Sequence, residues 1–150
     1  KVKKMATTTA TITLSSADLL SDNLSLSATM NLYQHNTTAT GLEQMNYHRL
    51  VIPTGTAFDL IEESAALTED ASYVYIINKN TDATDYVKIS INAEEIGRLY
   101  AGDWLFMPWD CDLSAAANDS SIEIEAFTHE HIIEYALFHN GETLVTEADS

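Results

Sequence analysis

Apolar and polar positions alternate along several short stretches of this chain. The clearest stretch is 24–33, in which Leu, Ala and Met at the even positions alternate with Ser, Thr, Asn and Tyr at the odd ones. Residues 86–91 alternate in the same way, with Val87, Ile89 and Ile91 on one side. A period of two residues indicates a β-strand that has one apolar face and one wet face.

The stretch 72–109 combines apolar runs with turn residues. Tyr73–Ile77 is apolar at every position, which is typical of a strand covered on both faces. The loop 78–84 is rich in Asn, Asp and Thr, whose side chains favour turns. The strands on either side of this loop, 73–77 and 85–91, are therefore predicted to form an antiparallel hairpin.

Glycine and proline mark the later part of this stretch. Gly97 interrupts a short strand and predicts a bulge or close packing. Residues 101–103 predict a turn before the apolar strand Trp104–Trp109. Because Pro108 cannot donate to a strand ladder, it predicts a strand end or a sheet edge.

The remaining segments predict short strands and polar loops. We expect an extended arm or edge strand within 5–14, a single Ser-capped helical turn in 15–20, loops at 34–41 and 110–120, strands at 45–52, 56–61, 121–128 and 131–139, a tight turn near 128–130, an ambiguous segment at 62–70, and a turn at 140–141 before a polar tail.

About eight or nine short strands without a convincing long helix predict an all-β, single-domain fold. An antiparallel β-sandwich or jelly roll is favoured, with a closed barrel second. The expected divisions are an N-terminal arm at 1–14, whose first four residues are an upstream extension or an added scar, a sandwich at 15–140 and a tail at 141–150. The predicted core residues are Leu24, Leu26, Met30, Leu32, Val87, Ile89, Ile91, Ile122, Ile124, Ile133, Tyr135 and Leu137.

The length and the charge of the chain exclude several classes of function. The chain has 150 residues, which fits one domain, and 23 acidic against seven basic residues give a net charge of −16. A body this acidic repels phosphate backbones, so nucleic-acid binding is not expected. No apolar run reaches about 18 residues, so no membrane span is expected. Lysines at positions 1, 3 and 4 precede no apolar segment, so no signal peptide is predicted there.

Two pairs of residues on strands offer candidate chemistry. His129 and His131 share a strand face and supply two metal ligands, which is an incomplete set. Glu123 and Glu125 resemble a carboxylate pair for glycoside hydrolysis, yet they alternate with apolar residues as the wet face of a strand does.

The loop after Trp109 offers weaker candidates. Asp110, Asp112, Asn118 and Asp119 supply oxygens for Ca²⁺, but their spacing matches no EF-hand. Cys111 is the only cysteine, which excludes an intramolecular disulfide, and it has no basic neighbour to activate it. We therefore predict no catalytic, cofactor or metal site.

Aromatic residues crowd the stretch 73–109 and occupy both parities of their strands. Some of them must therefore lie on the outer face of a sheet. There they could form a subunit interface or, less favoured, a platform that binds a sugar. The predicted interface residues are Tyr73, Tyr75, Tyr100, Trp104 and Trp109, together with Ile12 and Leu14 of the arm.

Three segments resemble small virion structural proteins of tailed bacteriophages, particularly marine and cyanobacterial ones. They are Tyr73–Asn78, Asp85–Ile89 and the run from Gly97 to Trp104 with Phe106-Met107-Pro108, in which a strand ending in Asn, a second strand and a Leu-x-x-Gly-Asp-aromatic turn recur. The resemblance covers about a quarter of the chain. It implies a β-sandwich displayed on a capsid or built into a tail, and it implies no catalytic residues.

The expected function is therefore a non-enzymatic capsid decoration or cement protein on the virion surface. Its expected partners are phage capsid or tail proteins and further copies of itself. One alternative is a tail, baseplate or fibre component that binds a receptor. The second is a carbohydrate-binding or carbohydrate-active module that uses the aromatics with Glu123 and Glu125.

Overall fold

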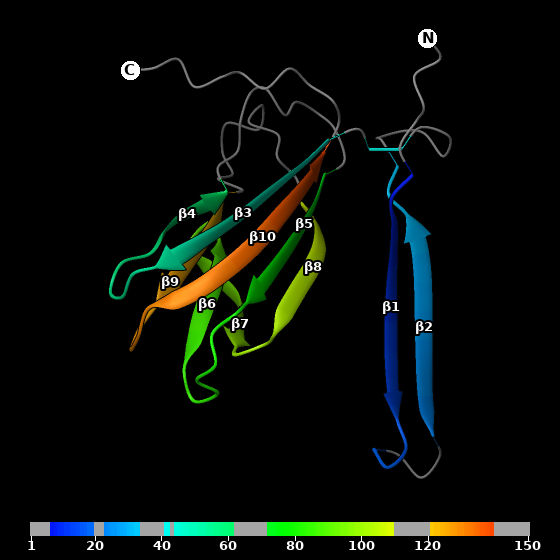
Figure 1. The fold of residues 1–150 in the computed structure, drawn as a ribbon, viewed down its shortest axis with the longest axis horizontal. Coiled ribbons are helices and arrows are strands. Elements are labelled where there is room, and N and C mark those ends of the chain that lie inside the picture. Colours follow the sequence, from blue (N-terminus) through cyan, green and yellow to red (C-terminus); the bar gives the residue numbers. More distant parts are fainter. Residues whose placement is uncertain are drawn as a thin grey trace.

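The computed structural model describes residues 7–19, 23–33, 41–42, 44–61, 72–109 and 121–139 (Figure 1). These residues form strands, turns and loops, and among them no helix is long and apolar enough to cross a membrane. The strands are β1 (Thr9–Ser16), β2 (Leu24–Asn31), β3 (Gln44–Ile52), β4 (Phe58–Ile61), β5 (Ser72–Asn78), β6 (Tyr86–Ile91), β7 (Glu94–Tyr100), β8 (Trp104–Trp109), β9 (Ile122–Ala126) and β10 (His131–His139).

Strands β3 to β10 form two antiparallel four-stranded sheets, ordered β3-β10-β5-β8 and β4-β9-β6-β7. The pairs are nested in the sequence: β6 with β7, β5 with β8, β4 with β9, and β3 with β10. The chain thus runs as one long hairpin that wraps into two layers, which is the jelly-roll arrangement. The predicted all-β sandwich of the jelly-roll type is confirmed.

The predicted hairpin of β5 with β6 is wrong. These strands lie in opposite sheets, because β5 pairs with β10 and β8 while β6 pairs with β7 and β9. The loop between them is long enough for the chain to cross from one sheet to the other. The turn after β9 makes the same crossing, so β9 and β10 do not pair either.

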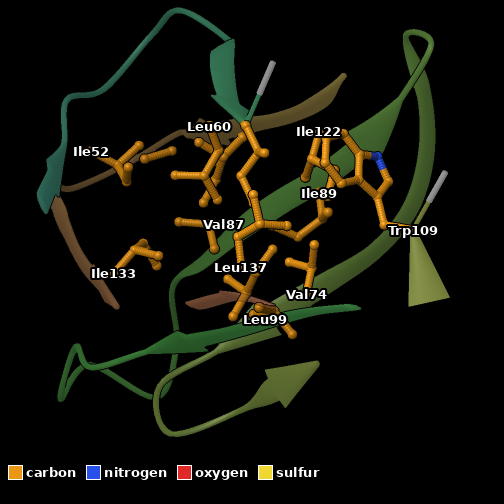
Figure 2. Close-up of a cluster of buried hydrophobic side chains, with 14 residues drawn as sticks. Ile52, Leu60, Val74, Val87, Ile89, Leu99, Trp109, Ile122, Ile133 and Leu137 are labelled. Carbon is orange, nitrogen blue, oxygen red and sulfur yellow. The ribbon is translucent and has the colours of Figure 1, made fainter. Parts of the chain in front are cut away.

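The core lies between the two sheets (Figure 2). Each fully buried Val, Leu or Ile contributes about 1.5–3 kcal/mol. Six of the predicted core residues are buried there, and Ile91 and Tyr135 pack against them partly buried. The six are Val87, Ile89, Ile122, Ile124, Ile133 and Leu137.

The first two strands form a separate two-stranded sheet. This sheet, hereafter the arm, extends beyond the predicted arm at 1–14 and includes β2, which was predicted to belong to the sandwich. Leu26 is 54 % exposed and Met30 42 % exposed, so their predicted place in the core is wrong. Leu24 is only half-buried, whereas Leu32, just beyond β2, is buried outside the core cluster. The alternation of this segment is real, but no described sheet covers its apolar side.

Local predictions from glycine and proline are confirmed. The pairing of β6 with β7 shifts register beside Gly97, as a bulge requires. Gly102 has a φ of +83° in the turn before β8, a conformation that glycine adopts without steric cost. Pro108 lies on β8, an edge strand.

The predicted helical turn in 15–20 is not seen in its described part. Strand β1 continues to Ser16, whose Oγ then accepts hydrogen bonds from the backbone N–H groups of Asp18 and Leu19 at 3.3 and 3.0 Å. The predictions for 34–40, 62–70, 110–120 and 140–150 lie outside the described residues.

Candidate interaction surface

The outer side of the sheet β3-β10-β5-β8 is lined by large apolar side chains. Strand registers place alternate residues of each strand on this side, while their neighbours Val74, Ile76 and Ile133 point into the core. We call this surface the outer aromatic face. It consists of Met45, Tyr47, Arg49, Val51, Tyr73, Tyr75, Ile77, Trp104, Phe106, Pro108, Ile132, Glu134, Ala136 and Phe138.

Aromatic rings contact one another across β5 and β8. The rings of Tyr73 and Phe106 stack with centroids 5.7 Å apart and planes 4° from parallel. Those of Tyr75 and Trp104 are 6.4 Å apart and tilted by 38°. Such ring pairs are worth about 0.5–1.5 kcal/mol each beyond the area that they bury, so they favour this arrangement of the four rings.

Much of the outer aromatic face is open to water. Trp104 is 50 % exposed, and three residues on β3 are exposed to a similar degree. Exposed apolar side chains therefore lie on both edge strands of this sheet, β3 and β8, and large exposed apolar surfaces mark interaction sites. The three residues are Met45, Tyr47 and Val51.

The face is electrically almost neutral, although the chain carries a net charge of −16. Its two charged residues, Arg49 and Glu134, neutralise each other with Nη1 and Oε1 3.6 Å apart. Glu134 also accepts a hydrogen bond from the hydroxyl of Tyr47, which raises the pKa of that phenol above 10.0. No unbalanced charge therefore lies among the described residues of this surface.

The outer side of the other sheet is different in kind. Lys88 and Glu125 form an ion pair of 2.6 Å there, and the Lys88 ammonium lies 5.5 Å from the ring centre of Phe127. Arg98 and Glu95 pair at 2.7 Å. This is the solvated face that the alternation of apolar and polar residues predicted. The ion pair with Lys88 accounts for the presence of Glu125 on this face.

The structure brings together only part of the predicted interface. Tyr73, Tyr75 and Trp104 share the outer aromatic face. Tyr100 lies on the outer side of the other sheet, against Tyr86 with ring centres 5.3 Å apart. Trp109 belongs to the core and is 5 % exposed, so its assignment to a surface is wrong.

The two arm residues of the prediction lie on a second apolar surface. Ile12 and Leu14 share one side of the arm with Leu26 and Met30, and all four are exposed. We call this side the arm face, which consists of Ala10, Ile12, Leu14, Ser16, Leu24, Leu26, Ala28 and Met30. The opposite side of the arm holds only Thr, Ser and Asn.

A buried polar cluster at one end of the sandwich was not predicted. The Asp85 carboxylate, 4 % exposed, accepts hydrogen bonds from the backbone N–H groups of Tyr86 and His129, each at 2.9 Å. Nδ1 of His129 lies 3.0 Å from Asp85 Oδ2. Burial opposes ionisation of Asp85, but these hydrogen bonds outweigh it and lower its pKa below 3.8.

His131, which is fully buried, lies beside this carboxylate. Its Nε2 is 3.2 Å from Asp85 Oδ2, a close polar contact rather than a well-formed hydrogen bond. Its Nδ1 lies 3.0 Å from the side-chain nitrogen of Asn78, which also donates to the Leu99 carbonyl. The cluster joins the ends of both sheets. It could not be predicted from local patterns, because His129 and His131 lie more than 40 residues from Asp85 in the chain.

Within the described residues, no group of three or more His, Cys, Asp or Glu side chains could hold a metal ion. His129 and His131 instead share the carboxylate of Asp85 as a structural contact. The acidic loop candidates Asp110, Cys111, Asp112, Asn118 and Asp119 lie outside the described residues.

No family model, no curated protein and no solved structure matches the chain.

Proposed function

We propose that this chain is a non-enzymatic structural protein that works by assembly. It uses the outer aromatic face to pack against another protein. The observation that carries the proposal is an exposed, nearly neutral sheet face, rich in aromatics, on a body of charge −16. Aromatic anchors with few charges at the centre are characteristic of protein interfaces.

The specific assembly that we propose is a phage virion, with the chain as a decoration or cement protein on the capsid. The jelly roll supports this as an analogy, since viral capsid domains use the fold. Lectin domains and many other proteins use it too, so the fold by itself carries little weight. The resemblance of 73–78, 85–89, 97–104 and 106–108 to small virion proteins makes the capsid the first choice and a tail, baseplate or fibre the second.

A carbohydrate-binding module is the other candidate class. The half-exposed Trp104 ring beside Tyr75 could stack on a sugar. A sugar also needs polar side chains that fix its hydroxyl groups. For that task the described face offers only the Arg49–Glu134 pair and the tyrosine hydroxyls. Because this set of polar groups is small, carbohydrate binding is the weaker candidate.

The test is rebinding to virions from which the chain has been stripped, with Trp104→Thr and Tyr75→Thr as variants. Removing either aromatic anchor should weaken binding about 30-fold, as hot-spot truncations do. Tyr100→Thr is the matched control, because Tyr100 is an exposed tyrosine on the opposite sheet.

Three outcomes separate the candidates. Loss of rebinding with both face variants, and not with the control, supports the assembly function. Gold-labelled antibody on intact particles then distinguishes head from tail. Unchanged rebinding by both face variants, or glycan binding that they abolish, would overturn the proposal.

A further inference from the structure

The arm is an amphipathic ribbon. Its register pairs Ile12 with Ala28 and Leu14 with Leu26, so apolar side chains from both strands share the arm face. The other side pairs Thr or Ser with Ser, Thr or Asn throughout, for instance Thr11 with Thr29, whose hydroxyls lie 3.0 Å apart. An isolated two-stranded hairpin is marginally stable in water, so the arm gains from a surface that covers its apolar side.

The arm projects from the edge of the sheet that carries the outer aromatic face. Neither β1 nor β2 is hydrogen-bonded to a four-stranded sheet, and Figure 1 shows the arm beside the sandwich. At its base the Leu32 N–H donates to the Thr8 carbonyl at 2.8 Å, and the Leu42 N–H donates to the Leu32 carbonyl at 3.2 Å. Leu42 precedes the edge strand β3 by a single intervening residue, so the arm is tied close to that edge.

The arm face and the outer aromatic face match in chemistry. The sixteen residues of β1 and β2 include no charged side chain, and the outer aromatic face holds one internally balanced pair. Two copies of charge −16 repel each other. Among the described residues, these two neutral apolar surfaces can approach each other at the smallest electrostatic cost. Among the strands that the structure describes, none packs over either surface.

We propose that the arm face of one copy packs on the outer aromatic face of a second copy. This inference rests on the proposed assembly function and names a partner for the same surface. The contact is sheet-on-sheet packing, with the apolar sides interleaved and the Thr and Ser side of the arm left in water. The hydrogen bonds of Leu32 and Leu42 hold the base of the arm near the start of β3, and the arm lies beside the sandwich (Figure 1), where a second copy can meet it.

The size of the contact favours a reciprocal exchange. An arm of eight residues per strand covers about 27 Å by about 10 Å, so one arm–sheet contact buries roughly 540 Å² counted over both surfaces. That is below the roughly 1,000 Å² that a specific interface needs, whereas two exchanged arms give about 1,100 Å². A two-fold dimer, in which each copy gives an arm to the other and receives one from it, meets this requirement.

The test is sedimentation of the full chain in about 0.5 M NaCl, where charge repulsion is screened beyond about 4 Å. Leu14→Thr with Leu26→Thr weakens the arm face while keeping good strand formers. Thr13→Ala with Ser27→Ala is the matched control, because this pair is adjacent in register and lies on the opposite side of the arm. We expect the arm variant to raise the dissociation constant at least about 30-fold and the control to leave it within about threefold.

A mixing experiment tests whether arm meets sheet. The arm variant keeps a good sheet face, and Tyr75→Thr with Trp104→Thr keeps a good arm. Each alone should sediment as a monomer, and an equimolar mixture should form a 1:1 complex at higher concentration through the one intact contact. Circular dichroism and melting temperature check that both variants keep the jelly roll.

The outcomes distinguish this inference from the proposed function. A wild-type chain that is monomeric at every concentration, an arm variant that associates like the wild type, or a mixture that forms no complex would overturn the arm exchange. If the Tyr75 and Trp104 variants still fail to bind virions in those cases, the assembly function stands without it. If they bind virions unchanged, the assembly function fails as well.

Discussion

Replacing Asp85 with Asn should destabilise the fold measurably. The carboxylate holds the turn between β9 and β10 against the start of β6 by accepting the backbone N–H groups of Tyr86 and His129. Hydrogen bonds to a charged acceptor contribute about 1.5–3 kcal/mol each. Asn keeps one acceptor oxygen and turns an amide group toward the other donor, so we expect a loss of about 1.5–3 kcal/mol in the free energy of unfolding. The ring of His129 is 62 % exposed and adds little.

Urea unfolding followed by circular dichroism measures this loss at pH 7. Asp59→Asn is the matched control, since Asp59 is an exposed carboxylate on β4, and it should change stability by at most about 0.5 kcal/mol.

The pH dependence gives a second check. The pKa of Asp85 is lowered in the fold from 3.8, so its contribution is complete above about pH 3.8 and is lost as the pH falls through the folded-state pKa. The difference between wild type and Asp85→Asn should therefore be constant from pH 7 to about pH 4 and shrink below it. Equal stability of the two proteins at pH 7, or a difference that persists in acid, would refute the role assigned to this carboxylate.

Three other outcomes are expected. Ile89→Ala should cost about 2–5 kcal/mol in urea unfolding, because Ile89 is 1 % exposed in the core; a smaller loss would contradict its burial. Gly102→Ala should cost about 1–2 kcal/mol through its φ of +83° alone, since a Cβ there meets no atom within 4 Å, and thermal unfolding measures it. Self-association should strengthen with salt in sedimentation.

The sequence predicted where the strands lie, because alternation reports the two sides of each strand. It did not predict their partners, because alternation is local. Strand β5 ends at Asn78, and the next strand, β6, begins just after Asp85. The loop between these two residues nevertheless carries the chain into the opposite sheet. Leu26 and Met30 show the same limit, since their side is apolar but faces no described sheet.

The residues of the candidate surface were predicted only in part, because the prediction did not use the parity of positions along each strand to assign individual residues. Trp104 and Trp109 are five residues apart on one strand, an odd separation that puts them on opposite sides, so strand parity alone could have moved Trp109 to the core. The cluster around Asp85 had no such local signal. His129 and His131 reach it from more than 40 residues away, and only the fold brings them together.

The expected effect of salt follows from where the charges lie. Association through ion pairs would weaken as salt screens them, and the Arg49–Glu134 pair is the one pair on the outer aromatic face among described residues. That pair is satisfied within one chain, so it offers no net attraction to a second copy. The remaining electrostatic contribution is repulsion between bodies of charge −16, which salt reduces, while salt hardly affects apolar burial below about 1 M. The dissociation constant should therefore fall as NaCl rises from about 0.02 to about 0.5 M, most steeply where the Debye length shrinks from roughly 20 to roughly 4 Å. A dissociation constant that rises with salt over this range would mean that charges hold the copies together, and the neutral faces would then not be the contact.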